Sequence, residues 1–467
     1  MRAFVEAFLE SPQALLKGEG LPGRVVVLTA RAPAAANDAL LRLDALGDSV
    51  LWEPGRSEGT DAAWTISGRG ETLRIDARGG ERWKDIEARA REVWPTVIEC
   101  REPGCSAPPI RLYGGGSFHP SGGDAIWAAF GDASFVLPRW VHGRCAGDAF
   151  LQLAFRSEEL ADRARLSAEV NRALDALEAT APRAPSRASQ PPRAAPADGQ
   201  GFASWCDLVT GALNGIRAHA FEKVVAARRT YVPLDRAATG APLLFLDRLR
   251  DDNGGCACFA FGRHDQLFFG ASPERLVFAE GCEVSTEALA GSLARSPDLD
   301  SNAVLALTAS EKDRREHSLV VDGIARALAP FGGTLHVPAE PTVRTLRRIH
   351  HLATPITLTL DAPRHVLSLV SALHPTPAVC GFPRAPAFEW IAEHERFDRG
   401  WYAGPVGWFD REGRGAFAVA IRSALLDADG VWVFAGAGIV ERSDPSAEYA
   451  ETALKQKTIL SALGLAP

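Results

Sequence analysis

The pattern of apolar and polar positions divides the chain into short strands and fewer, longer helices. Upstream of residue 180, alternating stretches predict strands at Gly23–Thr29, Ala62–Ser67 and Ser134–Pro138, whereas the glycine-rich run Tyr113–Phe118 predicts a turn. Leu160–Leu177 carries apolar residues at helical spacing, which predicts a helix. Strands in clusters beside separate long helices indicate a mixed α/β (α+β) design built on layered antiparallel sheets.

The second half of the chain mixes strands with two long helices. Apolar residues at helical spacing predict one helix over Asn302–Ala329. We expect a last helix with Asp444 as its cap and Pro445 in its first position, running to about Leu463. Further strands are predicted at Lys223–Arg228, Ala257–Gly262, Gln266–Gly270, Arg275–Ala279, Phe417–Leu425 and Val431–Ala435, the last two joined by a turn.

One segment has a different composition from the rest. Residues 181–200, APRAPSRASQPPRAAPADGQ, contain no large apolar side chain, so they predict a flexible loop or linker. The segment separates a strand-rich portion, residues 1–180, from residues 201–467. A chain of 467 residues suffices for one large domain or two to three ordinary ones, so the segment could join two domains or lie inside one.

Charge and apolar runs exclude several classes of protein. The formal net charge of −7 argues against a nucleic-acid or acidic-membrane partner, and no apolar run is long enough to span a membrane. The N-terminal apolar stretch is interrupted by Glu6 and Glu10, which makes a poor signal peptide. Eight scattered cysteines without zinc-site spacing indicate reduced thiols. We therefore expect a cytoplasmic protein and, since no coiled coil or apolar patch is evident, a monomer.

Lysine is rare in this chain, which makes each lysine informative. Only six of the 51 basic residues are lysines: Lys17, Lys84, Lys223, Lys312, Lys455 and Lys457. A buried lysine can give up its proton whereas an arginine cannot, so Lys223, in an apolar strand, is a candidate general base. Glu274, just after a turn between two strands, is a candidate acid. A solvated charge at a strand end is the alternative for each.

Carboxylates gather around a glycine-containing stretch near the C-terminus. The strand-like run ending at Phe434 is expected to break at Gly436–Gly438, where unpaired N–H groups would attract an anion. Glu448, Glu451 and Lys455 share one face of the helix that follows. An exposed Glu–Lys pair is the plain interpretation of that face.

A third carboxylate offers a different interpretation. Glu316 lies in the long predicted helix, where a surface pair with Lys312 is the simplest expectation. A divalent cation between Glu316 and Glu451 would instead explain why carboxylates stand beside an anion site. Oxygen ligands of this kind suit Mg²⁺.

Two further stretches are suited to binding a carboxylate. Thr286–Ser292 predicts a second glycine-containing turn after a strand, whose N–H groups would face an anion. Arg422 ends a strand-like run, and an arginine there suits bidentate carboxylate binding. A surface arginine is the alternative in so arginine-rich a chain.

Nine short motifs follow one another between residues 221 and 452. They are FEKVVAARR (221–229), FFGASPERLV (268–277), TEALAGS (286–292), SEKDRREHSLVVD (310–322), HHLATPI (350–356), LHPTPAVCGFP (373–383), GPVGWFD (404–410), FAVAIRSALL (417–426) and FAGAGIVERSDPSAEYAET (434–452). In this order they resemble the chorismate-utilising enzymes and, within that family, the isochorismate synthases. The resemblance covers nearly all of residues 200–467, whereas residues 1–180 match faintly, through GGGSFHP (114–120) and SFVLP (134–138).

The resemblance implies a fold, a reaction and a cofactor. It implies a single large domain of layered antiparallel sheets flanked by helices, with the site in a cleft between them. It also implies an isomerase that requires Mg²⁺ and converts chorismate to isochorismate by a 1,5 exchange of hydroxyl. Isochorismate is used for menaquinone, siderophores or salicylate, and the sequence leaves these three open.

The resemblance also implies a role for individual residues. Lys223 matches the base that activates water for attack at C2, and Glu274 matches the acid that protonates the departing C4 hydroxyl. The implied Mg²⁺ ligands are Glu316 and Glu451, with Glu448 beside them. The implied contacts to substrate carboxylates are Arg422, Tyr402, Lys455 and the backbone of Gly291, Ser292 and Gly438, while His351 matches a residue lining the same cleft.

Two positions separate the chain from related enzymes. Anthranilate synthases generally lack a lysine where Lys223 stands, and many aminodeoxychorismate synthases carry a lysine where Ala290 stands. Salicylate synthases share Lys223 and Glu274 and are the alternative, although HPTPA (374–378) is more similar to isochorismate synthases. A binding protein without turnover would lack Lys223 or Glu274, and both are present.

Overall fold

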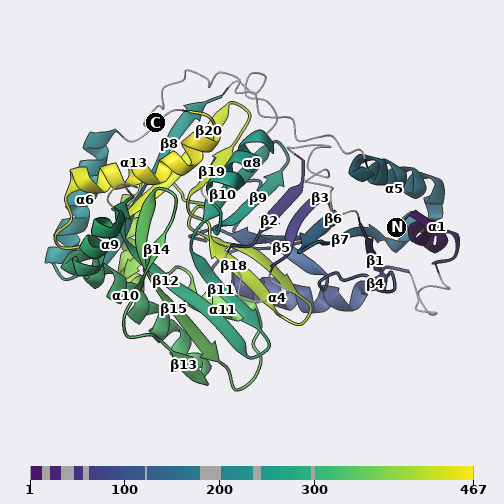
Figure 1. The fold of residues 1–467 in the computed structure, drawn as a ribbon, viewed down its shortest axis with the longest axis horizontal. Coiled ribbons are helices and arrows are strands. Elements are labelled where there is room, and N and C mark those ends of the chain that lie inside the picture. The colour runs from purple at the N-terminus through teal and green to yellow at the C-terminus, as the bar shows by residue number, and fades with distance from the viewer. Residues whose placement is uncertain are drawn as a thin grey trace.

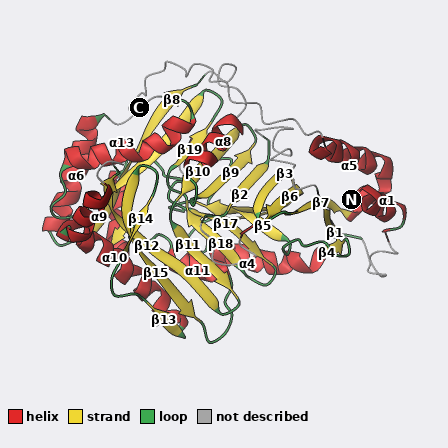
Figure 2. Cartoon of the chain, in the orientation of Figure 1, coloured by secondary structure: helices red, strands yellow, loops and turns green. Residues whose placement is uncertain are grey.

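The computed structural model describes residues 2–12, 22–32, 47–55, 63–120, 124–178, 201–234, 243–295 and 300–465. The predicted linker at 181–200 lies outside these residues. Figures 1 and 2 show strands through the middle of the molecule, with α1 and α5 at one end and α6, α9 and α10 at the other. No helix in the described part of the chain is both long and apolar enough to cross a membrane.

The strands form two hydrogen-bonded series that share β6. In the first series the neighbours follow the order β4, β1, β7, β6, β3, β2, β9, β10, β19, β20, β8, β16, and every pair is antiparallel except β1 with β4. The strands of this series are β1 (Val25–Arg31), β2 (Ser49–Glu53), β3 (Thr65–Ala77), β4 (Val97–Arg101), β6 (Ala133–Cys145), β7 (Asp148–Arg156), β8 (Lys223–Pro233), β9 (Ala257–Arg263), β10 (Gln266–Ser272), β16 (Gly381–Phe382), β19 (Ser423–Leu426) and β20 (Gly430–Ile439).

The second series leaves β6 in another direction. Its order is β6, β5, β17, β18, β11, β12, β15, and both β13 and β14 pair with the far side of β15. The strands added here are β5 (Arg111–Gly116), β11 (Arg275–Glu280), β12 (Glu283–Ala294), β13 (Thr334–His336), β14 (Thr342–Thr345), β15 (Ile349–Thr359), β17 (Pro405–Asp410) and β18 (Gly415–Val419). The chain passes between the two series at several places, and two of these connections, from β10 to β11 and from β18 to β19, lie together, because the N–H of Val419 donates to the carbonyl oxygen of Glu274.

Strands from before and after the 181–200 segment pair with one another in both series. In the first, β2 pairs with β9, so that Val50 lies opposite Phe261. In the second, β5 pairs with β17, so that Tyr113 lies opposite Trp408. Residues before and after the 181–200 segment therefore contribute to the same sheets.

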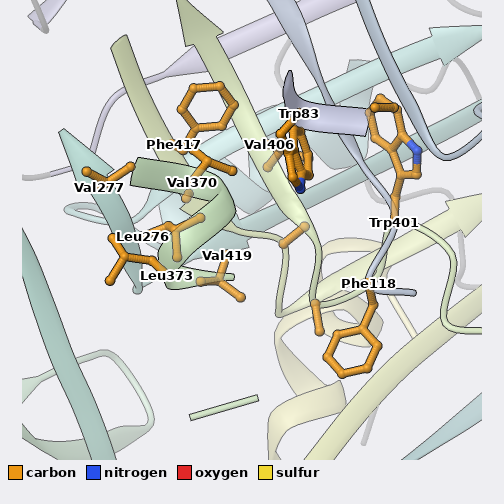
Figure 3. Close-up of a cluster of buried hydrophobic side chains, with 14 of the residues drawn as sticks. Trp83, Phe118, Leu276, Val277, Val370, Leu373, Trp401, Val406, Phe417 and Val419 are labelled. Atoms are coloured by element: carbon orange, nitrogen blue, oxygen red, sulfur yellow. The ribbon is translucent and has the colours of Figure 1, made fainter. Parts of the chain in front are cut away.

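Helices cover the strands and complete the core. In Figure 1, α13 lies along β20, while α10 packs against β12 and β15, and α4 packs against α11. Figure 3 shows part of the core, where Val370 and Leu373 of α11 lie against Leu276 of β11 and Val419 of β18. The helices are α1 (Arg2–Glu10), α4 (Arg82–Val93), α5 (Arg163–Glu178), α6 (Phe202–Arg217), α8 (Leu243–Asp252), α9 (Asp300–Ala309), α10 (Glu311–Leu328), α11 (Val366–Leu373), α12 (Arg384–His394) and α13 (Pro445–Ala462).

The last helix is confirmed in detail, because its signals are local. The side chain of Asp444 accepts hydrogen bonds from the N–H groups of Ser446 and Ala447, as a cap should. Pro445 occupies the first position, where its missing N–H has no consequence.

Three predictions about secondary structure are wrong, besides the two at Gly291 and at Gly436–Gly438 that are described with the site. The single helix over Asn302–Ala329 is two helices, because Ser310 caps α10 by accepting a hydrogen bond from the N–H of Asp313. The predicted turn Tyr113–Phe118 is mostly β5, whose glycines let the neighbouring backbone approach: a Cβ atom on Gly114 would collide with the carbonyl oxygen of Ser134. The predicted strand Phe417–Leu425 is divided between β18 and β19, with Arg422 in the left-handed region at a φ of 52°.

Candidate active site

A cleft lies beside the β10–β11 and β18–β19 connections. Glu274 belongs to the β10–β11 connection and Arg422 to the β18–β19 connection. Ser272 holds these connections together, since its hydroxyl donates to the carbonyl of Val419 and accepts from the N–H of Glu274. Ten of the twelve predicted site residues line the cleft: Glu274, Gly291, Ser292, Glu316, His351, Tyr402, Arg422, Gly438, Glu451 and Lys455.

The remaining two predicted residues lie directly behind this lining. Lys223, the first residue of β8, is fully buried, with its Nζ 3.0 Å from Glu316 Oε1. Glu448, in the first turn of α13, is also buried and interacts electrostatically with Glu451. A larger cavity lies on the other side of Glu274, lined also by Trp52, but it contains none of the other predicted site residues.

The predicted break of the strand at Gly436–Gly438 is not found in the structure. β20 does not break at Gly436–Gly438 but continues to Ile439, with Gly438 paired to Val225 of β8. A Cβ atom on Gly438 would collide with Glu316 Oε1 and lie 3.0 Å from Lys223 Cε. The absence of a side chain therefore makes room for the Lys223–Glu316 pair.

Glu274 is a buried carboxyl group that has one side-chain hydrogen bond in the part of the chain that the structure describes. The hydroxyl of Thr376 donates to its Oε1 at 3.2 Å. Burial raises the pKa of Glu274 to about 8, against the opposing effects of Thr376, Lys223 and Lys455. Glu274 therefore holds a proton at neutral pH and can donate it, as the acid role requires.

Arg422 is held in place by a chain of hydrogen bonds that passes through a histidine. Arg422 Nη2 lies 3.3 Å from His351 Nε2, and His351 Nδ1 lies 3.2 Å from the carbonyl oxygen of Gly291 and 3.0 Å from Ser292 Oγ. Burial and the positive charge of Arg422 keep the pKa of His351 well below its ordinary value. A neutral ring with its proton on Nδ1 donates to Gly291 and accepts from Arg422, so Arg422 is not a surface arginine.

The Gly291 region is a β-bulge inside a strand, not the turn that was predicted. β12 runs through it to Ala294, and its register with β15 shifts between Ala290 and Ser292. Gly291 has a φ of 74°, which favours glycine and lets the bulge form. Tyr402 closes another side of the cleft, stacked on Phe434 with ring centroids 5.1 Å apart.

Three carboxylates in or behind the cleft each pair with a lysine. The pairs are Glu316 with Lys223 at 3.0 Å, Glu448 with Lys312 at 2.9 Å, and Glu451 with Lys455 at 2.7 Å. The expected surface pair of Glu316 with Lys312 is therefore wrong, because tertiary contacts give each of them another partner. The Glu451–Lys455 pair does form, but its side chains are only 25% and 18% exposed.

The surroundings shift the pKa values of these carboxyl groups in opposite directions. Burial raises the pKa of Glu316, but the combined effects of Lys223, Lys455 and Lys312 hold the value below the ordinary one. For Glu448, burial and the negative charge of Glu451 raise the pKa in spite of Lys312.

The donor chemistry of these carboxylates fits Mg²⁺, although no metal site is preformed. In the residues that the structure describes, no three His, Cys, Asp or Glu side chains are placed together so as to hold a metal ion. Mg²⁺ needs only one or two protein carboxylates, with water and substrate oxygens completing its shell. Glu316 and Glu451 could supply these, but each would first have to turn from its lysine.

Sequence reasoning missed two residues of this site. Thr376, the partner of Glu274, lies within HPTPA, which was used only to compare families. Lys312 is one of the six lysines, but its partner was sought on its own helix, and Glu448 lies on another.

Comparison with known proteins places this geometry in a family. The family model described as "Chorismate binding enzyme" matches residues 37–464. The "Salicylate biosynthesis isochorismate synthase" of Pseudomonas aeruginosa is 40% identical over 412 residues, which are 85% of this chain and 82% of that protein. "Isochorismate synthase MenF" of Bacillus subtilis is 38% identical over 262 residues, 56% of this chain but only 55% of that protein. The solved structure of MenF, the menaquinone-specific isochorismate synthase from Escherichia coli, is 27% identical with a TM-score of 0.76, covering 98% of this chain and 99% of that one.

Proposed function

This chain is an enzyme of the chorismate-binding family, and from that premise we propose that it is an isochorismate synthase, a Mg²⁺-dependent isomerase that converts chorismate reversibly to isochorismate. The proposal is supported by the occurrence, in one cleft, of a buried lysine, a buried protonated carboxyl group and several groups suited to an anionic substrate.

We assign the two proton transfers to Lys223 and Glu274. The Lys223 amine takes a proton from a water molecule while that oxygen bonds to C2 of the substrate ring. The two ring double bonds each shift by one position, the C4–O bond breaks, and Glu274 gives its proton to the departing hydroxyl, which leaves as water. One water is consumed and one is released, so an acid and a base suffice and no oxidant is needed.

The substrate carboxylates would be held on the side of the cleft opposite the general acid. Arg422 presents a fixed guanidinium, which suits a carboxylate. Lys455, Tyr402 and His351 line the same cavity, as do the backbone groups of Gly291, Ser292 and Gly438. These groups would orient the ring and keep bulk water from it.

Glu316 and Glu451 would hold the Mg²⁺, with Glu448 behind them. When bound, the ion would neutralise and orient a carboxylate of the substrate. Glu316 and Lys223 are already in contact, so the residue that would bind the metal also positions the base.

The observation that carries the proposal is the burial of the Glu274 carboxyl group in the wall of the cleft, which raises its pKa, because a hydroxyl leaves a ring readily only when a proton is given to it. The test is to incubate purified protein with chorismate and Mg²⁺ and to separate the products by chromatography. Isochorismate alone, approaching an equilibrium mixture with chorismate, is the expected result. Glu274→Gln is the matched control and should yield no isochorismate.

A second candidate, salicylate synthase, makes isochorismate and then eliminates pyruvate. The same experiment separates the two, since salicylate with an equal amount of pyruvate would assign the chain to that activity. Neither product would refute both.

A further inference from the structure

The lysines that pair with Glu316, Glu448 and Glu451 differ in how easily each could move away from its carboxylate. Lys223 is enclosed by protein, with 1% of its side chain exposed. Lys455 is 18% exposed and is held a second time, because its Nζ also donates to the carbonyl of Gly436 at 2.9 Å. Lys312 is 35% exposed and, in the described part of the chain, its one side-chain hydrogen bond goes to Glu448.

Each of the three carboxylates has a lysine partner in the absence of a metal. Lys312 interacts electrostatically with Glu316 and Glu451 as well as with Glu448, and Asp313 adds a further carboxyl group beside Lys312 and Glu316. A divalent cation bound between Glu316 and Glu451 would repel the ammonium group of Lys312. The repulsion is relieved at least cost by moving out the ammonium group that has the shortest way to water.

We propose that Lys312 is a displaceable internal cation, which neutralises the carboxylates of the empty site and is driven into solvent when a divalent metal binds. Lys312 thereby sets the metal affinity of the site. The inference rests on the proposed function only for the identity of the metal ligands.

The choice of lysine in an arginine-rich chain agrees with this role. Three of the six lysines of the sequence lie against these carboxylates, although the chain carries 45 arginines that could supply the same charge. A guanidinium holds a carboxylate with two parallel hydrogen bonds, whereas an ammonium group on a flexible stem makes a point contact that a metal ion can replace.

The test is to measure Mg²⁺ binding to the metal-free protein by isothermal titration calorimetry at fixed pH and ionic strength, without substrate. Lys312→Met and Lys312→Gln should bind Mg²⁺ roughly two- to fivefold more tightly than the wild type, since a partly exposed pair of this kind is worth up to about 1 kcal/mol. Lys312→Gln keeps a donor for Glu448, so it covers the case in which Lys312→Met does not fold. Lys312→Arg should bind no more tightly than the wild type.

Lys84→Met is the control, because Lys84 pairs with Glu81 on the surface and is 82% exposed. Its Mg²⁺ affinity should equal that of the wild type. If both neutral Lys312 variants fold and bind Mg²⁺ with the wild-type affinity, the inference is wrong while the proposed function stands. If the wild type itself binds no Mg²⁺, the metal assignment in the proposed function is wrong instead.

Discussion

Glu274→Gln should abolish activity and at the same time remove a pH-dependent loss of stability of the folded protein. The carboxyl group is 4% exposed, and burial raises its pKa to about 8 from the ordinary 4.5. Between these two values the folded protein keeps a proton that the unfolded chain releases. The free energy of unfolding therefore falls as the pH rises through this interval, by up to about 1.4 kcal/mol per pH unit.

The size of the effect follows from the same two values. At pH 7 the folded state has lost about 3 kcal/mol relative to its stability at or below pH 4.5, and the loss is complete near pH 8. The nearby charges do not remove it: Lys223 and Lys455 favour the ionised form, but Glu287 opposes it, and the outcome remains a raised pKa. Glutamine has no proton to lose, so the variant should lack this contribution.

The assay is denaturant unfolding of both proteins at pH 5, 6, 7 and 8. We expect the stability of Glu274→Gln, relative to the wild type, to increase steadily with pH. Glu389→Gln, which changes an exposed carboxylate on α12, should follow the wild type. Parallel curves for Glu274→Gln and the wild type would show that Glu274 is ionised in the folded protein, and would refute its assignment as the acid.

Further predictions concern the base, the metal ligand and the glycine between them. Lys223→Ala should lower kcat by about 10²-fold or more while chorismate still binds, as measured by steady-state kinetics and by calorimetry; wild-type rates would remove Lys223 from the base role. Glu451→Ala should weaken Mg²⁺ binding and abolish Mg²⁺-dependent turnover, and an unchanged Mg²⁺ requirement would contradict the ligand assignment. Gly438→Ala should lower kcat by roughly 10²-fold with little loss of thermal stability, because the new methyl group displaces Glu316 and Lys223 by a fraction of an ångström or more; a fully active variant would mean that the pair tolerates the displacement.

The sequence predicted correctly those features that are determined by a few neighbouring residues. The cap at Asp444 and the strand around Lys223 were found because a few neighbouring residues determine them. The run through Gly436 and Gly438 was predicted wrongly for the opposite reason. Those glycines stay in a strand because β8 lies beside them and because Glu316 and Lys223 need the space, and neither condition is visible in the run itself.

In the site, too, contacts between distant segments decide which side chains pair. Lys312 and Glu316 are correctly spaced for a pair on one helix, yet both side chains point to residues of other elements. Spacing along a helix identifies which groups are near, but packing against α13 and β8 decides which of them meet. The order of the motifs predicted the twelve residues as one site, and ten of them line the cleft while Lys223 and Glu448 lie behind it, whereas Thr376 was found only in the structure.

The pairing of early strands with late strands has a consequence for how the protein is made. β5 needs β17 as its partner, and β17 leaves the ribosome nearly 300 residues later. Until β17 has been synthesised, one edge of β5 has no partner strand, and Leu112 and Tyr113, which are buried in the folded protein, lie along it. Unpaired strand edges of this kind can pair with strands of other chains. We expect synthesis of this protein to depend on chaperones that shelter the early strands. For the same reason, residues 201–467 expressed alone should fail to form the catalytic sheets, even though nearly all the residues of the cleft lie within them.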